Sequence, residues 1–165
     1  MLQPNSKCVA IIPISSVITN RGDGLTFKEQ LLKHHTLEAV MSMPLELFHN
    51  SKVSVVTVVV VITAHQPHPS GKKTWFGYWR DDGFVKTKSK GRIDLNNQWA
   101  SIKKKWINAF RNREVIPYFS IMREITPEDE WCAEAYLETD YSSLSQSDFE
   151  KELKKYAAHQ ILLGE

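Results

Sequence analysis

The sequence has few cysteines, glycines and prolines, and it has no apolar segment long enough to cross a membrane. Cys8 and Cys132 are its only cysteines, and two thiols so far apart define neither a disulfide framework nor a zinc site. Seven glycines and seven prolines among 165 residues exclude collagenous and low-complexity chains. The longest apolar run, residues 53–64, has about half of the ~20 residues that a membrane-spanning helix needs. Because the first residues also lack the apolar core of a secretory signal, we expect a globular chain in a reducing, cytoplasmic compartment.

Charge is unevenly distributed along the chain, although the formal net charge is only +2. Residues 72–113 hold 12 Lys and Arg against three Asp and Glu, whereas residues 114–165 hold four against 12. A basic segment of this kind can bind a polyanion such as nucleic acid, and it can also fold against its own acidic tail. Charge alone leaves both interpretations open.

The first half of the chain has the pattern of an α/β protein. Short apolar runs predict a buried strand over residues 7–13 and a second strand over 37–43. Between them, a loop over residues 19–24 is followed by Thr26, which is placed to cap an amphipathic helix that ends near His34–His35. The run over residues 53–64 is rich in β-branched residues and predicts a strand at a central position of the sheet.

The second half is richer in aromatic and charged residues. Two aromatic-rich runs, residues 74–79 and 84–87, flank an Asp-Gly step and predict a β-hairpin. Apolar residues at three- and four-residue spacing predict a basic amphipathic helix over residues 99–110. Acidic residues after a Thr-Pro step predict a helix over residues 126–138, and a last helix is expected over 147–161.

Three short patterns suggest chemistry but are also common in ordinary structure. Gly22 and Gly24 precede a helix, but the third glycine and the Lys-Ser/Thr step of a phosphate loop are missing, so we predict a plain loop. His65 and His68 lie near His49, but no carboxylate or cysteine is spaced to complete a metal site, so we predict surface histidines and no metal. The acidic pair Asp81–Asp82 stands before a glycine, as in many turns.

The order of the first segments is more informative than any single pattern. The segments are residues 1–13, residues 27–32, residues 37–44 with Leu47 and Phe48, and residues 53–61. In this order they resemble the C-terminal half of the catalytic domain of adenine-N6 DNA methyltransferases, above all the modification subunits of type I and related restriction-modification systems. Weaker similarity continues through residues 82–84 and 129–141. The resemblance implies an α/β fold that is the C-terminal half of a Rossmann-like methyltransferase sheet, with about three long strands plus a β-hairpin, followed by a helical tail.

The resemblance also implies a role for Phe48, the aromatic residue just before the final long strand. In the family this aromatic residue stacks on the flipped target adenine. An enzyme that methylates an exocyclic amine must pull the base out of the duplex, and an aromatic face can return about 1–3 kcal/mol of the lost stacking. The alternative is a core phenylalanine that fixes the loop to the sheet. The aromatic residues of the expected hairpin are predicted to pack in it rather than to stack on bases: Trp75, Phe76, Tyr78 and Trp79.

Two motifs of the family are missing from the sequence. The family binds S-adenosylmethionine with a glycine-bearing loop, and its chemistry uses an Asn/Asp-Pro-Pro-aromatic motif. The prolines of this chain are never adjacent, and its only close glycine pair lies in a later loop. The resemblance therefore implies that S-adenosylmethionine is the cofactor of the complete enzyme and that this chain alone binds no cofactor. It also implies that the chain is a C-terminal portion of such an enzyme and has no activity by itself.

We expect residues 1–92 to form a partial methyltransferase domain with the hairpin, and residues 93–165 to form a helical tail. The candidates for contact with DNA phosphates are Lys103, Lys104, Lys105, Arg111 and Arg113. Expected partners are DNA, the remaining N-terminal methyltransferase portion and a specificity subunit. An unpaired strand edge also predicts self-association. Two alternatives stay open: an interaction module that binds a partner through its helical tail, and a free-standing nucleic-acid-binding domain that uses the basic hairpin and helix.

Overall fold

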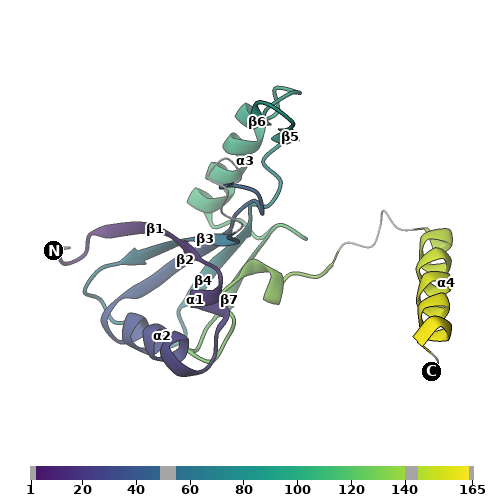
Figure 1. Cartoon of the computed structure of the whole chain (residues 1–165). Helices are drawn as coiled ribbons and strands as arrows, with labels where there is room; N and C mark the ends of the chain where they lie inside the picture. Colours follow the sequence, from purple (N-terminus) through teal and green to yellow (C-terminus); the bar gives the residue numbers. More distant parts are fainter. Residues whose placement is uncertain (1–2, 49–54, 140–144, 164–165) are drawn as a thin grey trace.

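The computed structural model describes residues 3–48, 55–139 and 145–163, and it centres on a five-stranded mixed sheet (Figure 1). The strands follow the order β1-β3-β2-β4-β7, in which β2 and β4 are parallel and the other neighbours are antiparallel. Their bounds are β1 Lys7–Pro13, β2 Thr36–Ser42, β3 Thr57–Thr63, β4 Lys73–Tyr78 and β7 Ser120–Glu124. The remaining elements are α1 Ser15–Ile18, α2 Gly22–His34, β5 Val85–Thr87, β6 Gly91–Ile93, α3 Trp99–Asn112, the 3-10 turn η2 Ala133–Ala135 and α4 Gln146–Leu163. The expected mixed α/β sheet with a helical tail is confirmed.

Strand β3 occupies the central position that its sequence predicts. It lies between β1 and β2, and its β-branched side chains alternate between the two faces of the sheet. Val58 and Val60 belong to the hydrophobic cluster on one face, and Val59 and Val61 to the cluster on the other. The described strand begins at Thr57, and residues 53 and 54 lie outside the described residues.

Strand β1 forms where the sequence predicts it, but the prediction that it is buried is wrong. It is an edge strand, paired only with β3, and its side chains alternate between half-buried and exposed. Val9 is 65% exposed and Ile11 is 55% exposed, and they lie opposite Val61 and Val59 of β3. The apolar run therefore marks an open edge of the sheet rather than a core strand.

The two faces of the sheet are covered by different segments. On one face, α1, α2 and the segment around η2 contribute Val17, Leu31 and Trp131 to the core (Figure 1). On the other face, the end of α3 contributes Ala109, which packs in a cluster with Trp75 of β4. Because both faces of the sheet are covered, β2 is buried over nearly its whole length.

Helix α2 begins earlier than the sequence predicts. Gly22, expected in a loop, is already its first residue, with a left-handed φ of +57°. Thr26 is not the N-cap, since it lies inside the helix and its hydroxyl donates to the Gly22 carbonyl at 3.3 Å. A Cβ atom at Gly24 would lie 2.7 Å from Cβ of Thr19, so this glycine lets α2 start close against the preceding turn.

The expected hairpin between residues 74–79 and 84–87 does not form. Strand β4 instead joins the main sheet between β2 and β7, and β5 pairs with β6 in a separate two-stranded sheet. The Asp-Gly step is a corner: the Asp82 carboxylate accepts the Phe84 N–H at 3.0 Å, and it also binds Arg92. Because Asp82 is held by these contacts, the chain turns out of the main sheet at this point.

The helix expected over residues 126–138 is also wrong, because only the short turn η2 forms there. Trp131 is fully buried, its backbone N–H donates to the Val17 carbonyl at 3.0 Å, and its indole N–H donates to the Thr126 carbonyl at 2.8 Å. The buried Lys28 ammonium donates to the Asp129 carbonyl at 2.6 Å. These tertiary contacts use backbone groups that a helix would need, so burial of Trp131 overrides the local helix signals.

A half-buried carboxylate links the open edge strand to the rest of the sheet. Glu38 lies at a β-bulge of β2, where the pairing with β3 shifts by one residue. Its carboxylate accepts hydrogen bonds from Lys7 of β1 at 2.8 Å and from Thr63 of β3 at 2.5 Å, and Lys72 lies 3.2 Å away. Burial raises the pKa of Glu38, but these partners together outweigh burial and lower the pKa to about 2.

We expect Glu38→Gln to lower the free energy of unfolding by about 1–2 kcal/mol at neutral pH, since both lysine partners are partly exposed. A carboxylate with a lowered pKa stabilises the fold above its ordinary pKa near 4.5 and loses this contribution as the pH falls towards 2. Urea unfolding of both proteins should therefore show a difference at neutral pH that shrinks at about pH 3. Glu46→Gln, which removes an exposed ion pair, is the control and should change little. An equal difference at both pH values would contradict this account.

Candidate nucleic-acid interface

The candidate site lies where the parallel strands β2 and β4 end. The carboxyl ends of parallel strands meet at one edge of a sheet, which is where α/β proteins bind their ligands. Here the Trp79 N–H donates to the Ser42 carbonyl at 2.8 Å, and the Met43 N–H donates to the Thr57 carbonyl at 3.0 Å. The two chain segments that leave this edge are the turn Pro44–Phe48 and the segment that begins at Arg80.

Phe48 lies in the turn that follows β2 and is half-buried. The turn is closed by the Leu47 N–H, which donates to the Pro44 carbonyl at 3.3 Å. Phe48 belongs to neither of the two hydrophobic clusters of the described residues. Half-burial at this position fits a side chain that contacts a ligand, and it also fits one that fixes the turn to the sheet, so the role of Phe48 stays a prediction.

An arginine and a glutamate fix the base of this turn. The Arg80 guanidinium donates to the Met43 carbonyl at 2.9 Å and, through Nε, to the Glu134 carboxylate at 2.7 Å. Glu134 also accepts a hydrogen bond from the hydroxyl of the buried Ser42. Only 14% of the Arg80 side chain is exposed, so this pair is shielded from water better than an ordinary surface ion pair.

A cavity of about 390 Å³ lies beside the turn. It is lined by Pro44, Leu45, Glu46, Tyr78, Arg80, Arg92 and Glu134. Lys86 of β5 and Glu46 of the turn form an ion pair with 3.3 Å between nitrogen and oxygen. The cavity is thus bounded by the turn that carries Phe48 and by the segment that leaves the sheet after β4.

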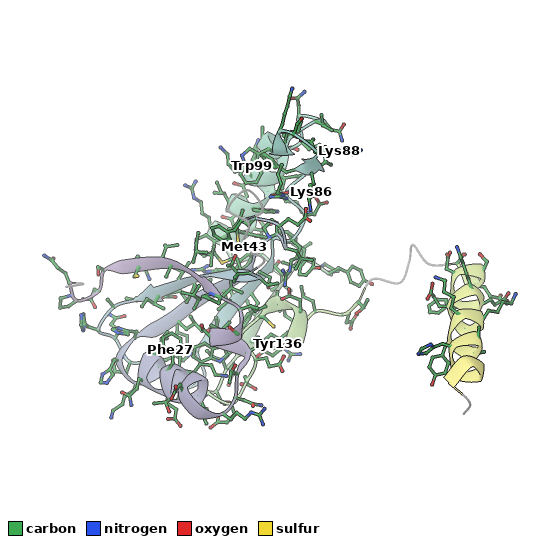
Figure 2. The ribbon with its side chains drawn as sticks, viewed as in Figure 1. Phe27, Met43, Lys86, Lys88, Trp99 and Tyr136 are labelled. Atoms are coloured by element: carbon green, nitrogen blue, oxygen red, sulfur yellow. The ribbon has the colours of Figure 1, made fainter. Side chains whose placement is uncertain are left out.

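Residues 80–113, called the arm below, project from the sheet and contain β5, β6 and α3 (Figure 2). Arg92 and Asp82 form a bidentate ion pair with distances of 2.9 and 2.6 Å at the base of the arm. A row of aromatic contacts continues this packing, with ring centroids 5.8 Å apart for Phe84 and Trp99 and 5.5 Å apart for Trp99 and Trp106. The hairpin β5–β6 and helix α3 are therefore packed together as one body.

Three of the four aromatic residues in and next to β4 pack inside the protein, but they do so around the main sheet rather than in the expected hairpin. Trp75 and Phe76 are fully buried in the clusters on opposite faces. Trp79 stacks on Trp106 of α3 with 4.9 Å between the centroids. Tyr78, 37% exposed, lines the cavity beside the turn.

The amphipathic helix predicted over residues 99–110 is confirmed as α3. Four of its five candidate cations are exposed: Lys103, Lys104, Lys105 and Arg111. Arg113 differs because it forms the left-handed C-cap of α3, and its half-buried guanidinium donates to the Phe110 carbonyl at 3.2 Å. Burial lowers the pKa of this guanidinium from its ordinary value. The exposed four are the better placed to reach a phosphate.

The other candidate patterns show ordinary structural roles. The glycine pair serves packing where α2 begins, since a Cβ atom at Gly24 would meet the Thr19 side chain. Asp81 accepts the Gly83 N–H at 3.1 Å, as a turn residue does. His68 is half-buried rather than exposed, because its Nδ1 accepts the Leu37 N–H at 3.2 Å, and burial lowers its pKa. His49 lies outside the described residues.

Neither a metal-binding cluster nor a membrane-spanning helix occurs in the part of the chain that the structure describes. Within residues 3–48, 55–139 and 145–163, no three His, Cys, Asp or Glu side chains are grouped so that they could hold a metal ion. None of the helices in these ranges combines the length and apolarity that crossing a membrane requires.

Sequence reasoning missed the polar residues that shape the site. Arg80 and Glu134 are 54 positions apart, and Lys86 and Glu46 are 40 positions apart. No local pattern pairs such residues. The opposite charges of residues 72–113 and 114–165 were the only available signal, and the Arg80–Glu134 pair is one place where the two segments meet.

The chain belongs to the N-6 DNA methylase family, whose model matches residues 1–162. The expected resemblance to adenine-N6 DNA methyltransferases is thereby confirmed. A curated relative is the type II restriction enzyme and methyltransferase RM.BcgI of Heyndrickxia coagulans, which is 28% identical over 161 residues. That match covers 98% of this chain and 25% of RM.BcgI, so the chain spans about a quarter of its relative's length.

Solved structures share the fold. The type I restriction-modification methyltransferase subunit from Streptococcus thermophilus is 21% identical, with a TM-score of 0.53 over 72% of this chain and 23% of that subunit. A chain of a type I R-M system, from work on its complex assembly and conformational transition, is 18% identical. Its TM-score is 0.60, and the match covers 97% of this chain and 35% of the other. At such low identity, these similarities establish the fold alone.

Proposed function

We propose that this chain forms the target-adenine and DNA side of an N6-adenine DNA methyltransferase of a restriction-modification system. Its sheet would be the C-terminal half of a Rossmann-like methyltransferase sheet. The observation that carries the proposal is the position of Phe48, half-buried and outside both hydrophobic clusters, at the edge where β2 and β4 end. Family membership and the basic arm beside this edge support it. Phe48 is assigned the stacking contact with the extruded adenine.

The methyl donor belongs, in this proposal, to a portion that the chain does not contain. S-adenosylmethionine would supply the methyl group in the complete enzyme, meaning this chain together with the portion that binds the donor. This assignment is supported by the sequence, in which the glycine-bearing loop and the Asn/Asp-Pro-Pro-aromatic motif of the family are missing. The open edge of β1, with Val9 and Ile11 exposed, is a suitable surface for the remaining half of the sheet. A DNA-modifying role would place the complete enzyme in the cytoplasm.

In this proposal the expected boundary at residue 92 falls within β6, so both parts of the chain contribute to the arm. Residues 1–92 carry Phe48 and most of the main sheet, and residues 93–165 begin with the basic helix α3. The pairing of β7 with β4 joins the two parts physically. The four exposed cations of α3 are assigned to DNA phosphates, with Arg113 as a weaker candidate.

We expect replacement of Lys103, Lys104 and Lys105 by Ala to weaken binding of all DNA sequences alike. Neutralisation of a phosphate by a lysine releases counterions, so the slope of log affinity against log salt should flatten by up to about 0.9 for each phosphate that is no longer neutralised. Fluorescence anisotropy with a labelled duplex over a salt series measures both quantities. An unchanged slope would show that this face of α3 is exposed to solvent but does not bind phosphates.

Helix α4 favours a second role, as an interaction module. Every described side chain from residue 146 to 159 is exposed, including an apolar row at helical spacing formed by Phe149, Leu153 and Tyr156. Such a row is typical of a helix that packs against another helix. We assign it to a partner chain, for which a specificity subunit is the proposed candidate.

We expect the isolated chain to self-associate through β1, because an unpaired apolar edge recruits further strands. Light scattering over a wide concentration range should show species larger than a monomer. Val9→Lys with Ile11→Lys places charges on the exposed face of this edge and should restore the monomer. A clean monomer of the unmodified chain at every concentration would contradict this expectation.

A further inference from the structure

The tip of the hairpin β5–β6 carries cations that are not among the five named candidates for contact with DNA phosphates. Lys86, Lys88 and Lys90 are all exposed. Lys86 pairs with Glu46, whereas the described ion pairs and hydrogen bonds provide no carboxylate for the ammonium groups of Lys88 and Lys90. Figure 2 shows Lys86 and Lys88 on the side of the arm opposite Trp99.

The carboxylates of the arm are already engaged elsewhere. Asp82 binds Arg92 with two hydrogen bonds at the base of the hairpin. Asp94 accepts the backbone N–H groups of Gln98 and Trp99, at 2.8 and 3.0 Å, where α3 begins. Asp81 accepts the Gly83 N–H within its own turn. The positive charge at the tip is therefore not neutralised from within the arm.

The hairpin tip has a defined shape. The Thr87 hydroxyl donates to the Gly91 carbonyl at 2.9 Å and accepts the Lys90 N–H at 3.0 Å. Gly91 has a φ of +69°, which favours glycine and allows the tight return of the chain. A closed turn of this kind holds its lysines on a short, protruding segment, so less conformational entropy is lost when they bind a ligand.

The hairpin is also tied to the turn that carries Phe48. Lys86 of β5 lies 3.3 Å from Glu46, which is two positions before Phe48. Arg92 of β6 and Glu46 line the same cavity beside that turn. The tip therefore extends from the immediate neighbourhood of the proposed base-stacking residue, and not from a remote part of the surface.

We propose that the hairpin β5–β6 is a second DNA-backbone contact, in which Lys88 and Lys90 bind phosphates of the duplex next to the extruded adenine. The inference rests on the proposed function and names the ligand of a surface that this function leaves unassigned. Two lysines on a closed turn act as point charges for phosphates, and they carry no base specificity of their own. Together with α3, they would bind DNA on two sides of the arm.

The test uses the 165-residue chain itself with a fluorescein-labelled duplex of about 20 base pairs, between about 50 and 200 mM KCl. The variant Lys88→Ala with Lys90→Ala should weaken binding and flatten the salt slope by up to about 1.8, or about 0.9 for each phosphate. Lys88→Arg with Lys90→Arg should restore both quantities. The matched control is Lys33→Ala with Lys73→Ala, which removes two exposed lysines outside the arm and should leave the slope unchanged.

Three results would overturn the proposal: an unchanged slope in the Lys88/Lys90 variant, an equal loss of affinity in the Lys33/Lys73 control, or no binding of the duplex by the chain. A competition assay distinguishes DNA from an acidic protein partner. If a poly-glutamate peptide displaces the labelled duplex as effectively as unlabelled DNA does, the hairpin is assigned to an acidic protein partner instead. Since this assay contains no extruded base and no methyl donor, its failure is distinguishable from failure of the Phe48 assignment.

Discussion

Phe48→Ala should lower the rate of adenine methylation by the complete enzyme roughly 5- to 150-fold, the equivalent of about 1–3 kcal/mol of base stacking. The effect should fall on the extruded state of the base, because Phe48 is uncharged and neutralises no phosphate. Binding of the duplex and its salt dependence should therefore stay near their original values. A 2-aminopurine at the target position reports extrusion through its fluorescence, and its signal in the saturated complex should fall in the variant.

The control for this prediction is the neighbouring residue. Leu47 is also half-buried in the same turn, but its side chain has no aromatic face. Leu47→Ala should change methylation much less than Phe48→Ala, and Phe48→Tyr should retain most of the activity. If Phe48→Ala unfolds the chain, or if methylation and the 2-aminopurine signal are both unchanged, Phe48 is not the stacking residue.

The second large effect concerns the methyl donor. The isolated chain should neither bind S-adenosylmethionine at micromolar concentrations nor transfer a methyl group, because its sequence has neither the glycine-bearing loop nor the Pro-Pro step of the family. Isothermal titration with the donor, together with tritium transfer to mixed-sequence DNA, measures both.

Addition of the donor-binding portion should restore methyl transfer, and this reconstitution is the positive control for the assay. The restored activity should depend on the open edge of β1, so that Val9→Lys with Ile11→Lys weakens reconstitution. Micromolar donor binding or measurable turnover by the chain alone would contradict the proposal that it is one part of the enzyme.

Local sequence patterns correctly predicted the elements in which the pattern itself specifies the buried face. The β-branched run that became β3 and the periodic apolar positions of α3 both specify a buried face, and both formed as expected. The strand β7 was missed because its five residues include the charged Arg123 and Glu124, so it lacks an apolar run. Its place in the sheet comes from pairing with β4, which is distant in the sequence.

Tertiary contacts determined the structure of the segments that were predicted wrongly. The Asp82–Arg92 pair and the parallel alignment of β4 with β2 replaced the expected hairpin. Burial of Trp131 replaced the expected helix. Within the site, the position of Phe48 could be inferred from the order of segments. The Arg80–Glu134 contact that fixes the turn of Phe48 could not be inferred, because the two residues are 54 positions apart in the sequence.

The most direct measurement of the central claim is a photochemical cross-link from the target base. In the complete enzyme, a duplex that carries 5-iodouracil in place of the target adenine is irradiated, and the attached peptide is identified by mass spectrometry. Our account predicts attachment at Phe48, with loss of the cross-link in Phe48→Ala. Attachment at Tyr78 or Trp79 instead, or an undiminished cross-link in Phe48→Ala, would contradict it.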